Sequence, residues 1–349
     1  MNSHPILIIG QGLAGTALAW RLWERGVSFT IVDRDEALTS SKAAAGLLTP
    51  ITGMRLTLTE HYGAWLGEAL KFYRQKERVL GLRFVHSRRH VRWFKNDKEP
   101  QRWATRMADP RVNAFIRSND PTFDAEVFSV ERGGFEMKHS GYLDTATYLA
   151  ASRRFFDQLG HVVTTDFDHR ELDVNASEVT WRGTTYRVAI FATGWEAARH
   201  PWFDWVPFLP VRGTILTARA DLHGEHRIMS KGCWVMPRED GTLRIGSTYE
   251  VAFDRPNEVD PAKLAELHET LRRFVKVPVE VLDQRAAVRP SIEHQRVLIG
   301  RHPGKPAIAF LNGLGSKGTL QSPAVSRLLL SHLLDGASLP PAMDLSGNF

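Results

Sequence analysis

The chain has 349 residues, of which 43% are hydrophobic and 24% are charged, and its formal net charge is +6. These values are ordinary for a soluble globular protein, and no apolar run is long enough to cross a membrane. The single cysteine, Cys233, excludes an intramolecular disulfide framework, and no Cys/His cluster has metal-ligand spacing. Because the first apolar strand begins at Ile6, we expect no signal peptide and a cytoplasmic location.

Four consecutive aliphatic residues at positions 6–9 predict a strand buried on both faces, which is typical of parallel sheets. Three glycines follow in the spacing G-x-G-x-x-G: Gly10, Gly12 and Gly15. Such glycines let the backbone turn tightly, approach a pyrophosphate and pack the next helix, expected over 14–25, against the strand. A second strand over 29–32 ends on Asp33, whose carboxylate could accept hydrogen bonds from an adenosine ribose. This order of elements predicts a dinucleotide site.

The pattern of an apolar strand that ends in glycine recurs twice further along the chain. Strands expected over 188–192 and 307–311 end in Thr193-Gly194 and in the glycine-rich stretch 312–318. In a parallel sheet, ligands bind at the carboxyl ends of the strands, where short turns present backbone N–H groups. The three junctions most simply converge on one ligand, so the nucleotide-binding domain should be discontinuous.

The segments between these strands have a different character. Residues 206–250 alternate and turn like antiparallel strands, with a hairpin turn at 239–241, whereas 60–80 and 261–276 have helical periodicity. We therefore predict an α/β fold with an α+β cap, in which a discontinuous Rossmann-like domain carries a mainly antiparallel substrate domain. The predicted cofactor domain comprises 1–80, 136–205 and 285–349, and the predicted substrate or cap domain comprises 81–135 and 206–284.

Short motifs in this order resemble the FAD-dependent amine and amino-acid oxidoreductases, the group of D-amino-acid, glycine and sarcosine oxidases. Besides the opening fingerprint, the resemblance rests on residues 40–46, 192–195, 210–213, 237–238 with Gly241 and Gly246, 288–290, and 312–320. It covers almost the whole chain, and the order and spacing of the motifs make it specific. The resemblance implies that the ligand is FAD rather than NAD, which the fingerprint alone leaves open.

The resemblance also implies where FAD is held. The residues expected to bind it are Gly10, Gly12, Leu13, Ala14, Gly15, Asp33, Arg34, Ser41, Ala44, Ala45, Gly46, Leu47, Thr193, Gly194, Trp195, Arg212, Gly213, Gly313, Gly315, Ser316, Lys317, Gly318 and Thr319. Among them, Arg34 would border the adenine and the small residues 44–46 would pass beneath the flavin. Residues 315–319 would surround its pyrimidine end, where Lys317 could stabilise the anionic reduced ring. We expect non-covalent FAD, because Cys233 is not placed like the flavin-linking cysteines of sarcosine oxidases.

Three residues are expected on the substrate side: Arg289, Tyr249 and Trp234. By the resemblance, Arg289 would clamp the α-carboxylate of the substrate, which its planar guanidinium can bind in bidentate fashion. Trp234 stands where glycine oxidases carry a pocket tyrosine, and Tyr249 falls at a pocket position on the neighbouring strand. The implied reaction is hydride transfer from a neutral amine to flavin N5, followed by hydrolysis of the imine. The alternatives are a structural ion pair for Arg289 and core packing for the two aromatic residues.

A second signal lies in residues 83–117, which contain ten Lys/Arg and three Asp/Glu, an excess of seven positive charges. Basic residues alternate there with Trp93, Phe94 and Trp103, a pattern that can follow a phosphate backbone and stack on bases. A solvated basic face of the cap is the simpler interpretation. However, 313–318 with Ser322-Pro323 is more similar to the oxidoreductase half of bifunctional bacterial tRNA wobble-uridine enzymes than to glycine oxidases.

The sequence thus supports three hypotheses about function. The first is an FAD-dependent oxidase or dehydrogenase that acts on the C–N bond of an α-amino or N-alkylamino acid such as glycine, sarcosine or a D-amino acid. The second is removal of the carboxymethyl group from 5-carboxymethylaminomethyl-uridine in tRNA bound through residues 83–117. The third is a non-catalytic flavoprotein. No membrane contact is expected, and no particular oligomeric state is predicted.

Overall fold

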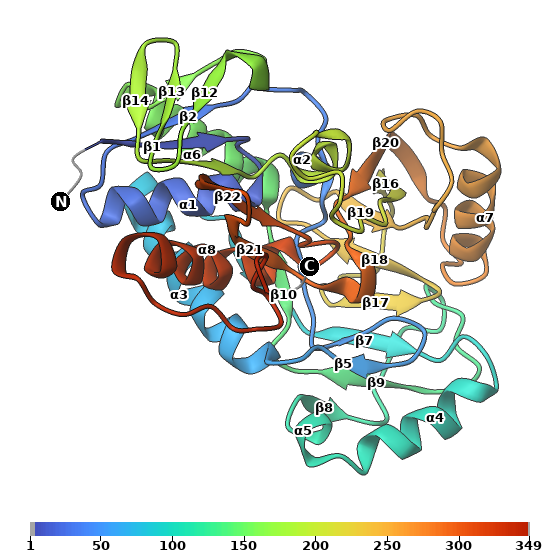
Figure 1. The fold of residues 1–349 in the computed structure, drawn as a ribbon. Coiled ribbons are helices and arrows are strands. Elements are labelled where there is room, and N and C mark those ends of the chain that lie inside the picture. The colour runs from blue at the N-terminus through green and yellow to red at the C-terminus, as the bar shows by residue number, and fades with distance from the viewer. Residues whose placement is uncertain (1–3, 348–349) are drawn as a thin grey trace.

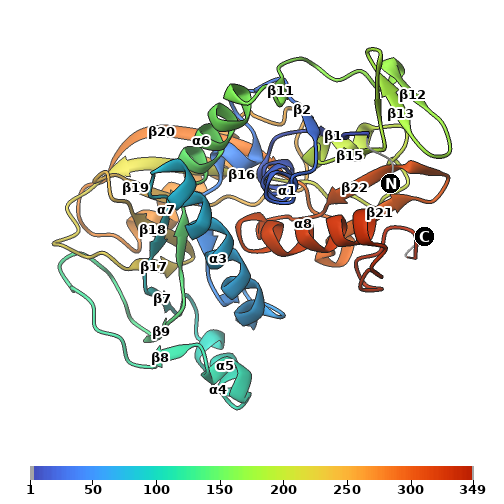
Figure 2. The same ribbon diagram turned by 90° about the vertical axis from the view of Figure 1, so that its left-hand side faces the viewer.

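The computed structural model describes residues 4–347 and contains two large sheets that lie side by side (Figure 1). The six-stranded sheet lies at the left of this view and the eight-stranded sheet at the right. Figure 2, turned by 90°, keeps the two sheets separate, with the helices α1, α3 and α8 close to the six-stranded one. The predicted combination of a mainly parallel sheet and a mainly antiparallel sheet is therefore present in the fold.

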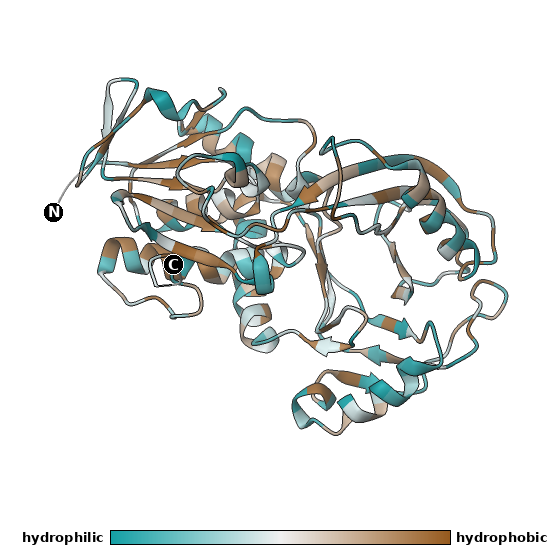
Figure 3. Ribbon diagram, turned by 45° about the vertical axis from the view of Figure 1, so that its right-hand side comes forward, coloured by the Kyte–Doolittle hydropathy of each residue, from teal (hydrophilic) through white to brown (hydrophobic). Residues whose placement is uncertain are grey.

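The six-stranded sheet has the order β11-β2-β1-β15-β22-β21 and is parallel except for β21. Its strands are β1 (Ile6–Ile9), β2 (Phe29–Val32), β11 (Val162–Val163), β15 (Val188–Phe191), β21 (Leu298–His302) and β22 (Lys305–Asn312). Ile6 and Ile8 face one hydrophobic core, and Leu7 and Ile9 face another. The predicted burial of β1 on both faces is confirmed. Figure 3 shows the same pattern as hydrophobic colour along these strands.

Four helices cover one face of this sheet: α1 (Leu13–Glu24), α3 (Tyr62–Leu80), α6 (Thr145–Gln158) and α8 (Gly318–Asp335). The other face packs against a small antiparallel sheet of β12 (Leu172–Val174), β13 (Val179–Trp181) and β14 (Thr184–Tyr186), and against the 3-10 helix η2 (Gly194–Arg199). Because both faces are covered, the sheet presents only the ends of its strands to a ligand.

The eight-stranded sheet has the order β20-β16-β19-β18-β17-β7-β9-β8, and only β17 and β7 pair in parallel. Its strands are β7 (His90–Trp93), β8 (Ile116–Ser118), β9 (Gly134–Met137), β16 (Val211–Arg219), β17 (Ile228–Lys231), β18 (Cys233–Pro237), β19 (Leu243–Gly246) and β20 (Glu280–Arg289). The predicted hairpin at 239–241 is confirmed, because it joins β18 to β19. Helix α7 (Pro261–Arg272) shares a core with one face of this sheet.

Shorter elements complete the fold. They are α2 (Ser40–Ala43), α4 (Lys98–Met107), α5 (Pro110–Asn113), β3 (Leu47–Leu48), β4 (Ile51–Thr52), β5 (Thr57–Leu58), β6 (Val85–Ser87), β10 (Gly141–Leu143), η1 (His169–Glu171) and η3 (Glu293–Gln295). The domain boundaries proposed at 136 and 285 fall inside β9 and β20, both of which belong to the eight-stranded sheet. Across residues 4–347, no helix combines the length and hydropathy needed to span a bilayer.

Candidate active site

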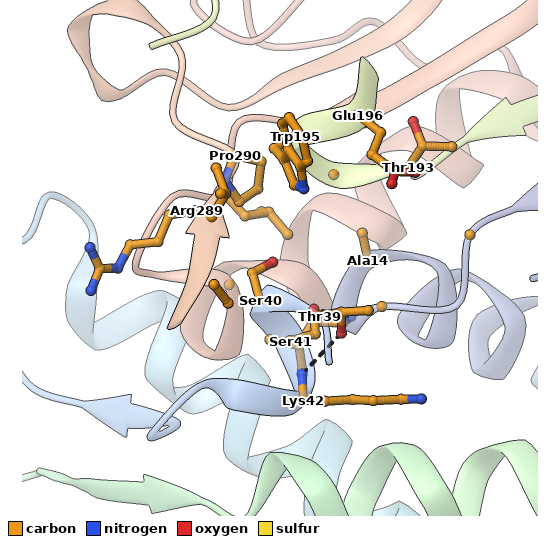
Figure 4. A pocket seen from close by; sticks show the side chains of 18 of the residues that line it. Ala14, Thr39, Ser40, Ser41, Lys42, Thr193, Trp195, Glu196, Arg289 and Pro290 are labelled. Carbon is orange, nitrogen blue, oxygen red and sulfur yellow. Dashed lines mark hydrogen bonds between the residues drawn. The ribbon is translucent and has the colours of Figure 1, made fainter. Parts of the chain in front are cut away.

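A cavity of about 690 Å³ lies where the carboxyl ends of the parallel strands meet the eight-stranded sheet. All three strand–glycine junctions line it, through Gly10 after β1, Thr193 after β15 and Gly315 after β22. The predicted convergence of the junctions is therefore confirmed. Figure 4 shows Arg289 at one end of this cavity and Thr193 toward the other, with Ser40 and Ser41 of α2 between them.

Most residues predicted to bind FAD line this cavity. They are Gly10, Gly12, Leu13, Ala14, Asp33, Arg34, Ser41, Ala44, Ala45, Gly46, Leu47, Thr193, Gly194, Trp195, Gly213, Gly315, Ser316, Gly318 and Thr319. Four predicted residues lie outside its lining: Gly15, Arg212, Gly313 and Lys317. Gly15 acts through packing, because a Cβ there would overlap the carbonyl oxygen of Gly10. Lys317 is the N-cap residue of α8, where burial lowers the pKa of its ammonium group.

The nucleotide end of the cavity offers free polar groups at the start of α1. Gly12 is the N-cap residue and has no side-chain cap. The N–H of Leu13 donates to Ser41 Oγ at 3.1 Å, and the following N–H groups of the first turn point out of the helix end. Asp33 holds the preceding turn, because its Oδ2 accepts a hydrogen bond from the backbone N of Gln11 at 2.7 Å. The side-chain atoms Gln11 Nε2 and Thr193 Oγ1 are buried, line the cavity and have no partner among the described residues. These donors and acceptors fit a dinucleotide.

At the other end, the chain passes close to the cavity through residues 44–47. Gly46 has a φ of +70°, and a Cβ at this position would overlap the carbonyl oxygen of Leu143. No other residue fits there without moving the backbone. Gly315 also lies in the left-handed region, at φ +50°, and Leu47 and Ser316 complete the lining. The small residues 44–46 leave room beside the backbone, which suits the isoalloxazine ring of a flavin.

Arg34 does not face the cavity alone. Its guanidinium donates to Glu36 at 2.6 Å and to Glu196 at 2.5 Å, and it lies 3.7 Å from Asp166. The hydrogen bond to Glu36 and the bond to Glu196 raise the pKa of Arg34, although partial burial opposes them. All four residues line the cavity, so the predicted adenine neighbour belongs to an ionic cluster at the rim.

Arg289 ends strand β20 with its side chain half-buried against β16. Its Nη2 donates to Ser247 Oγ at 2.8 Å and lies 3.5 Å from the carbonyl oxygen of Thr248. Burial lowers the pKa of this guanidinium, and nearby Tyr249 and Glu250 oppose the shift. Among residues 4–347, no carboxylate lies within 4.0 Å of it, so the alternative of a structural ion pair is wrong. The remaining donors are available to a ligand.

Two glycines on neighbouring strands let the large side chains lie flat on the sheet. A Cβ on Gly213 would lie 2.6 Å from Cζ of Arg289, and one on Gly246 would lie 2.7 Å from Cζ2 of Trp234. Trp234 is half-buried and lines the cavity, as predicted. Tyr249 is 70% exposed and outside the lining, so the structure supports neither its pocket position nor its core packing.

The structure corrects the prediction for Arg212. This residue is 5% exposed and forms an ion pair with Glu250 on the opposite face of β16 from Gly213. Side chains alternate along a strand, so only one of two neighbouring residues can face the cavity. Gly313 likewise supports the turn after β22 rather than the cavity, because a Cβ there would meet the carbonyl oxygen of Arg296.

Several lining residues have no counterpart in the sequence analysis: Gln11, Glu36, Pro256 and Asn257. Ser247, which also lines the cavity, follows β19 and could have been found from the Gly-Ser-Thr sequence after a predicted strand. Asn257 carries no such signal, because it lies in an irregular loop whose course depends on long-range packing. Its Nδ2 lies 3.4 Å from Glu36 Oε1.

Cys233 lies next to Trp234 on β18 and therefore points to the opposite face of the sheet. Its side chain is 4% exposed in the core shared with α7, where burial raises the pKa of the thiol to about 12. It does not line the cavity. A thiol in this position is neither reactive nor placed to reach a flavin.

The basic segment 83–117 does not have the surface that its sequence suggested. Trp93, Phe94 and Trp103 are at most 6% exposed and belong to hydrophobic cores, so they cannot stack on bases. Much of the positive charge is also paired: Arg88 with Glu239, Arg89 and Arg117 with Glu136, and Arg92 with Glu99. The predicted stacking of nucleic-acid bases on these three aromatic rings is therefore wrong.

One group of possible metal ligands lies outside the cavity. Asp124, Glu126 and His223 bring their ligand atoms within 4.8 Å of one another at the surface. His223 Nδ1 lies 2.9 Å from Asp124 Oδ2, and this hydrogen bond raises the pKa of the imidazole. Asp124 and Glu126 are close in sequence, but His223 lies 99 residues beyond Asp124, so spacing alone could not reveal the group.

Comparison with known proteins agrees with this geometry. The family profile of the FAD dependent oxidoreductases called DAO matches residues 5–331. The tRNA 5-methylaminomethyl-2-thiouridine biosynthesis bifunctional protein MnmC of Burkholderia orbicola is 28% identical over 328 residues, which cover 87% of this chain and 49% of that protein. The chain thus spans about half the length of this relative.

Solved structures share the fold. Glycine oxidase from Geobacillus kaustophilus superposes with a TM-score of 0.78 and 18% identity, over 98% of this chain and 97% of its own. Iminodiacetate oxidase from Chelativorans sp. BNC1 gives a TM-score of 0.77 and 18% identity, over 96% and 97%. With the family profile and a cavity that fits a dinucleotide, these findings show that the chain is a member of the DAO family of FAD-dependent oxidoreductases.

Proposed function

We propose that this enzyme oxidises the C–N bond of an α-amino or N-alkylamino acid. The observation that carries the proposal is Arg289, a half-buried guanidinium that lines the cavity without a carboxylate partner among the described residues. A charge left unpaired at a partly buried site calls for a ligand of opposite charge. Ser247 fixes one of its nitrogens at 2.8 Å, which leaves a planar fork for a substrate carboxylate.

FAD, when bound, supplies the acceptor for a hydride and so for two electrons. The residues of this chain orient the substrate: Arg289 holds the carboxylate, and Trp234 forms a wall of the same cavity. The Cα–H of a neutral amine leaves as hydride and its N–H as a proton, which gives an imine. Water then converts the imine to a carbonyl compound and a free amine. Positioning in a site with little water accounts for most of the required catalysis.

The names of two similar proteins support a substrate of the N-substituted glycine type. Iminodiacetate, the compound named for one structural neighbour, is itself a glycine that carries a second carboxymethyl group. Glycine is named for the other. One carboxylate of such a compound would bind Arg289, which lines the same cavity as residues 44–47, where the flavin would be held. The proposal therefore places glycine, sarcosine and iminodiacetate first among the substrates.

Anaerobic mixing of the FAD-loaded enzyme with single compounds tests this proposal. Glycine, sarcosine, iminodiacetate and D-amino acids are added separately, and loss of the oxidised-flavin absorbance is followed in time. Reduction by one of these free acids is the expected result. Reduction only by a modified tRNA contradicts this function, and no reduction by any amine favours a non-catalytic flavoprotein. Acid precipitation of the same protein tests the non-covalent cofactor, because a yellow pellet would contradict it.

A second candidate, oxidation of a carboxymethylaminomethyl group on tRNA, is favoured by a different observation. An open groove of about 700 Å³ runs along the end of α3 and is lined by Lys71, Arg74, Arg78 and Arg83. None of these four cations has a carboxylate within 4.0 Å among the described residues, and all four are exposed. Glu77, also in the groove, accepts hydrogen bonds from the backbone of residues 84 and 85. Unpaired cations in a groove are suited to phosphates.

Charge reversal tests this candidate. Arg74→Glu with Arg78→Glu is expected to weaken binding of bulk tRNA and to lower the salt dependence of binding by about one ion per lost phosphate contact. Arg219→Glu, an exposed position outside the groove, is the matched control. Equal tRNA binding by all three proteins, or reduction by free amino acids with no effect of tRNA, contradicts a tRNA substrate.

A further inference from the structure

One side of the cofactor cavity is lined in part by an irregular segment that follows β19. This segment, residues 251–259, connects the end of β19 to α7 and is here called the strap. Pro256 and Asn257 of the strap line the cavity beside Arg34 and Glu36, which follow β2. Asn257 Nδ2 contacts Glu36 Oε1 at 3.4 Å. The strap therefore crosses from the substrate region to the nucleotide end of the cavity.

A buried ion pair stands at the start of the strap. Arg212 and Glu250 are 5% and 4% exposed, and Glu250 Oε2 accepts from Nε of Arg212 at 2.7 Å and lies 2.5 Å from Nη2. Their backbones also exchange hydrogen bonds, at 2.9 Å and 3.0 Å. The other carboxylate oxygen, Oε1, accepts from Thr248 at 2.5 Å. Glu250 is thus fixed on both oxygens, as a buried carboxylate must be.

Arg212 reaches beyond this pair into the strap. Its Nη1 donates to the carbonyl oxygen of Arg255 at 2.7 Å, and its Cζ lies 5.4 Å from the centre of the Phe253 ring. At the far end, Asp260 accepts hydrogen bonds from the first turn of α7 and lies 3.9 Å from Arg212. One guanidinium therefore contacts the residues that flank the strap, Glu250 and Asp260, and also Phe253 and Arg255 within it.

We propose that the strap retains FAD in its cavity and that Arg212, together with Glu250, is the positioning residue that holds the strap closed. Irregular surface loops are ordinarily among the most mobile parts of a protein. Here the backbone next to Pro256 is tied to a side chain that is itself fixed in the sheet. Arg212 thus contributes to cofactor binding from a distance, and the proposal depends on FAD but on no particular amine substrate.

Arg212→Lys tests the proposal, because a lysine keeps the charge and loses the planar fork that joins Glu250 to Arg255. The dissociation constant of FAD is measured by the fluorescence of released flavin and is expected to rise about tenfold, as for loss of one charge-assisted hydrogen bond. Hydrogen exchange should accelerate in residues 251–259, with the melting temperature of the apoprotein close to that of the wild type. Phe253→Ala, which leaves the buried pair intact, should shift both quantities in the same direction.

Arg255→Ala is the matched control, because only the backbone carbonyl of this residue contacts Arg212 and its side chain is exposed. It should leave FAD binding and hydrogen exchange unchanged. Unaltered FAD affinity in Arg212→Lys despite faster exchange of the strap would overturn the retention role. Faster exchange throughout the eight-stranded sheet would mean that Arg212 stabilises the sheet rather than the strap, and would equally overturn the proposal.

Discussion

Replacing Arg289 with alanine should remove substrate recognition and leave the cofactor in place. The guanidinium lines the cavity and touches Ser247 and Thr248, but it makes no contact with the nucleotide end near Gly12. The substitution therefore removes the proposed carboxylate clamp from one end of the cavity only. Because the side chain is half-buried at the end of β20, the effect on folding should be small compared with the effect on turnover.

The structure sets the size of the expected effect. Nη2 already donates to Ser247 at 2.8 Å, and the other nitrogens have no carboxylate partner, so two N–H donors can meet one carboxylate. A hydrogen bond between charged groups contributes about 1.5–3 kcal/mol. Loss of two such bonds predicts a fall in kcat/KM of about a hundredfold to ten-thousandfold. Arg289→Lys keeps one charge and should recover part of this loss.

Stopped-flow reduction with the best amine substrate measures the rate, and the visible spectrum of the purified protein measures the FAD content. Wild type, Arg289→Ala and Arg289→Lys are compared at equal FAD occupancy. A value of kcat/KM for Arg289→Ala within about threefold of the wild type would refute the clamp. Loss of FAD from the alanine variant would contradict the prediction that Arg289 binds the substrate without contributing to FAD binding.

Three further predictions concern packing and protonation. Gly213→Ala should displace the guanidinium of Arg289, because the new Cβ would lie 2.6 Å from its Cζ, and should raise KM about tenfold with FAD retained. Gly15→Ala should push α1 away from the carbonyl oxygen of Gly10, lowering the free energy of unfolding by about 1–3 kcal/mol and releasing FAD. His90→Gln should make the free energy of unfolding fall less steeply as the pH is lowered. Burial lowers the pKa of His90 to about 3, so the unfolded chain binds a proton first and stability falls as pH drops from about 6.5 toward 3, by about 1.4 kcal/mol per unit.

Each of these predictions has a control in the same chain. Gly67→Ala, where a Cβ meets nothing within 4 Å, should leave KM unchanged, and an equal rise there would contradict the role of Gly213. In Gly12→Ala the new Cβ would lie 2.9 Å from Ser41 Oγ, which belongs to a side chain that can move. This substitution should therefore weaken FAD binding without unfolding the protein. His223→Gln, at an exposed histidine whose pKa is raised by Asp124, should not reproduce the acid profile of His90→Gln.

The nucleotide half of the molecule could be predicted because its signals are local. Residues 6–9 and 188–191 are apolar runs followed closely by glycine. Because ligands bind at the carboxyl ends of parallel strands, these short runs are enough to locate the nucleotide site. The order of the eight-stranded sheet could not be predicted in the same way. Its one parallel pair joins 90–93 to 228–231, which lie far apart in sequence and share no turn that would fix their register.

The errors in the site follow from the alternation of side chains along a strand. The motif around Arg212 and Gly213 indicates a strand beside the cavity, but it does not say which of two neighbours faces inward. The structure places the glycine in the cavity and the arginine on the other face. The resemblance implies a pocket position for Tyr249 on the neighbouring strand, yet β19 ends at Gly246 and the tyrosine is 70% exposed. Sequence therefore located the strands, and packing decided which side chains they present.

The central strands of the six-stranded sheet come from the two ends and the middle of the chain. During synthesis β1 is made before its neighbour β15, and β22 follows β15 after a long intervening segment. Until then one edge of β15 has no partner, and unpaired edges of nascent sheets invite pairing with other chains. The loop at 313–319 follows β22, so FAD can meet a finished cavity only after this loop has been translated. Cofactor loading should accordingly follow the synthesis of this loop, and bound FAD should then stabilise a domain whose central strands are made far apart in time.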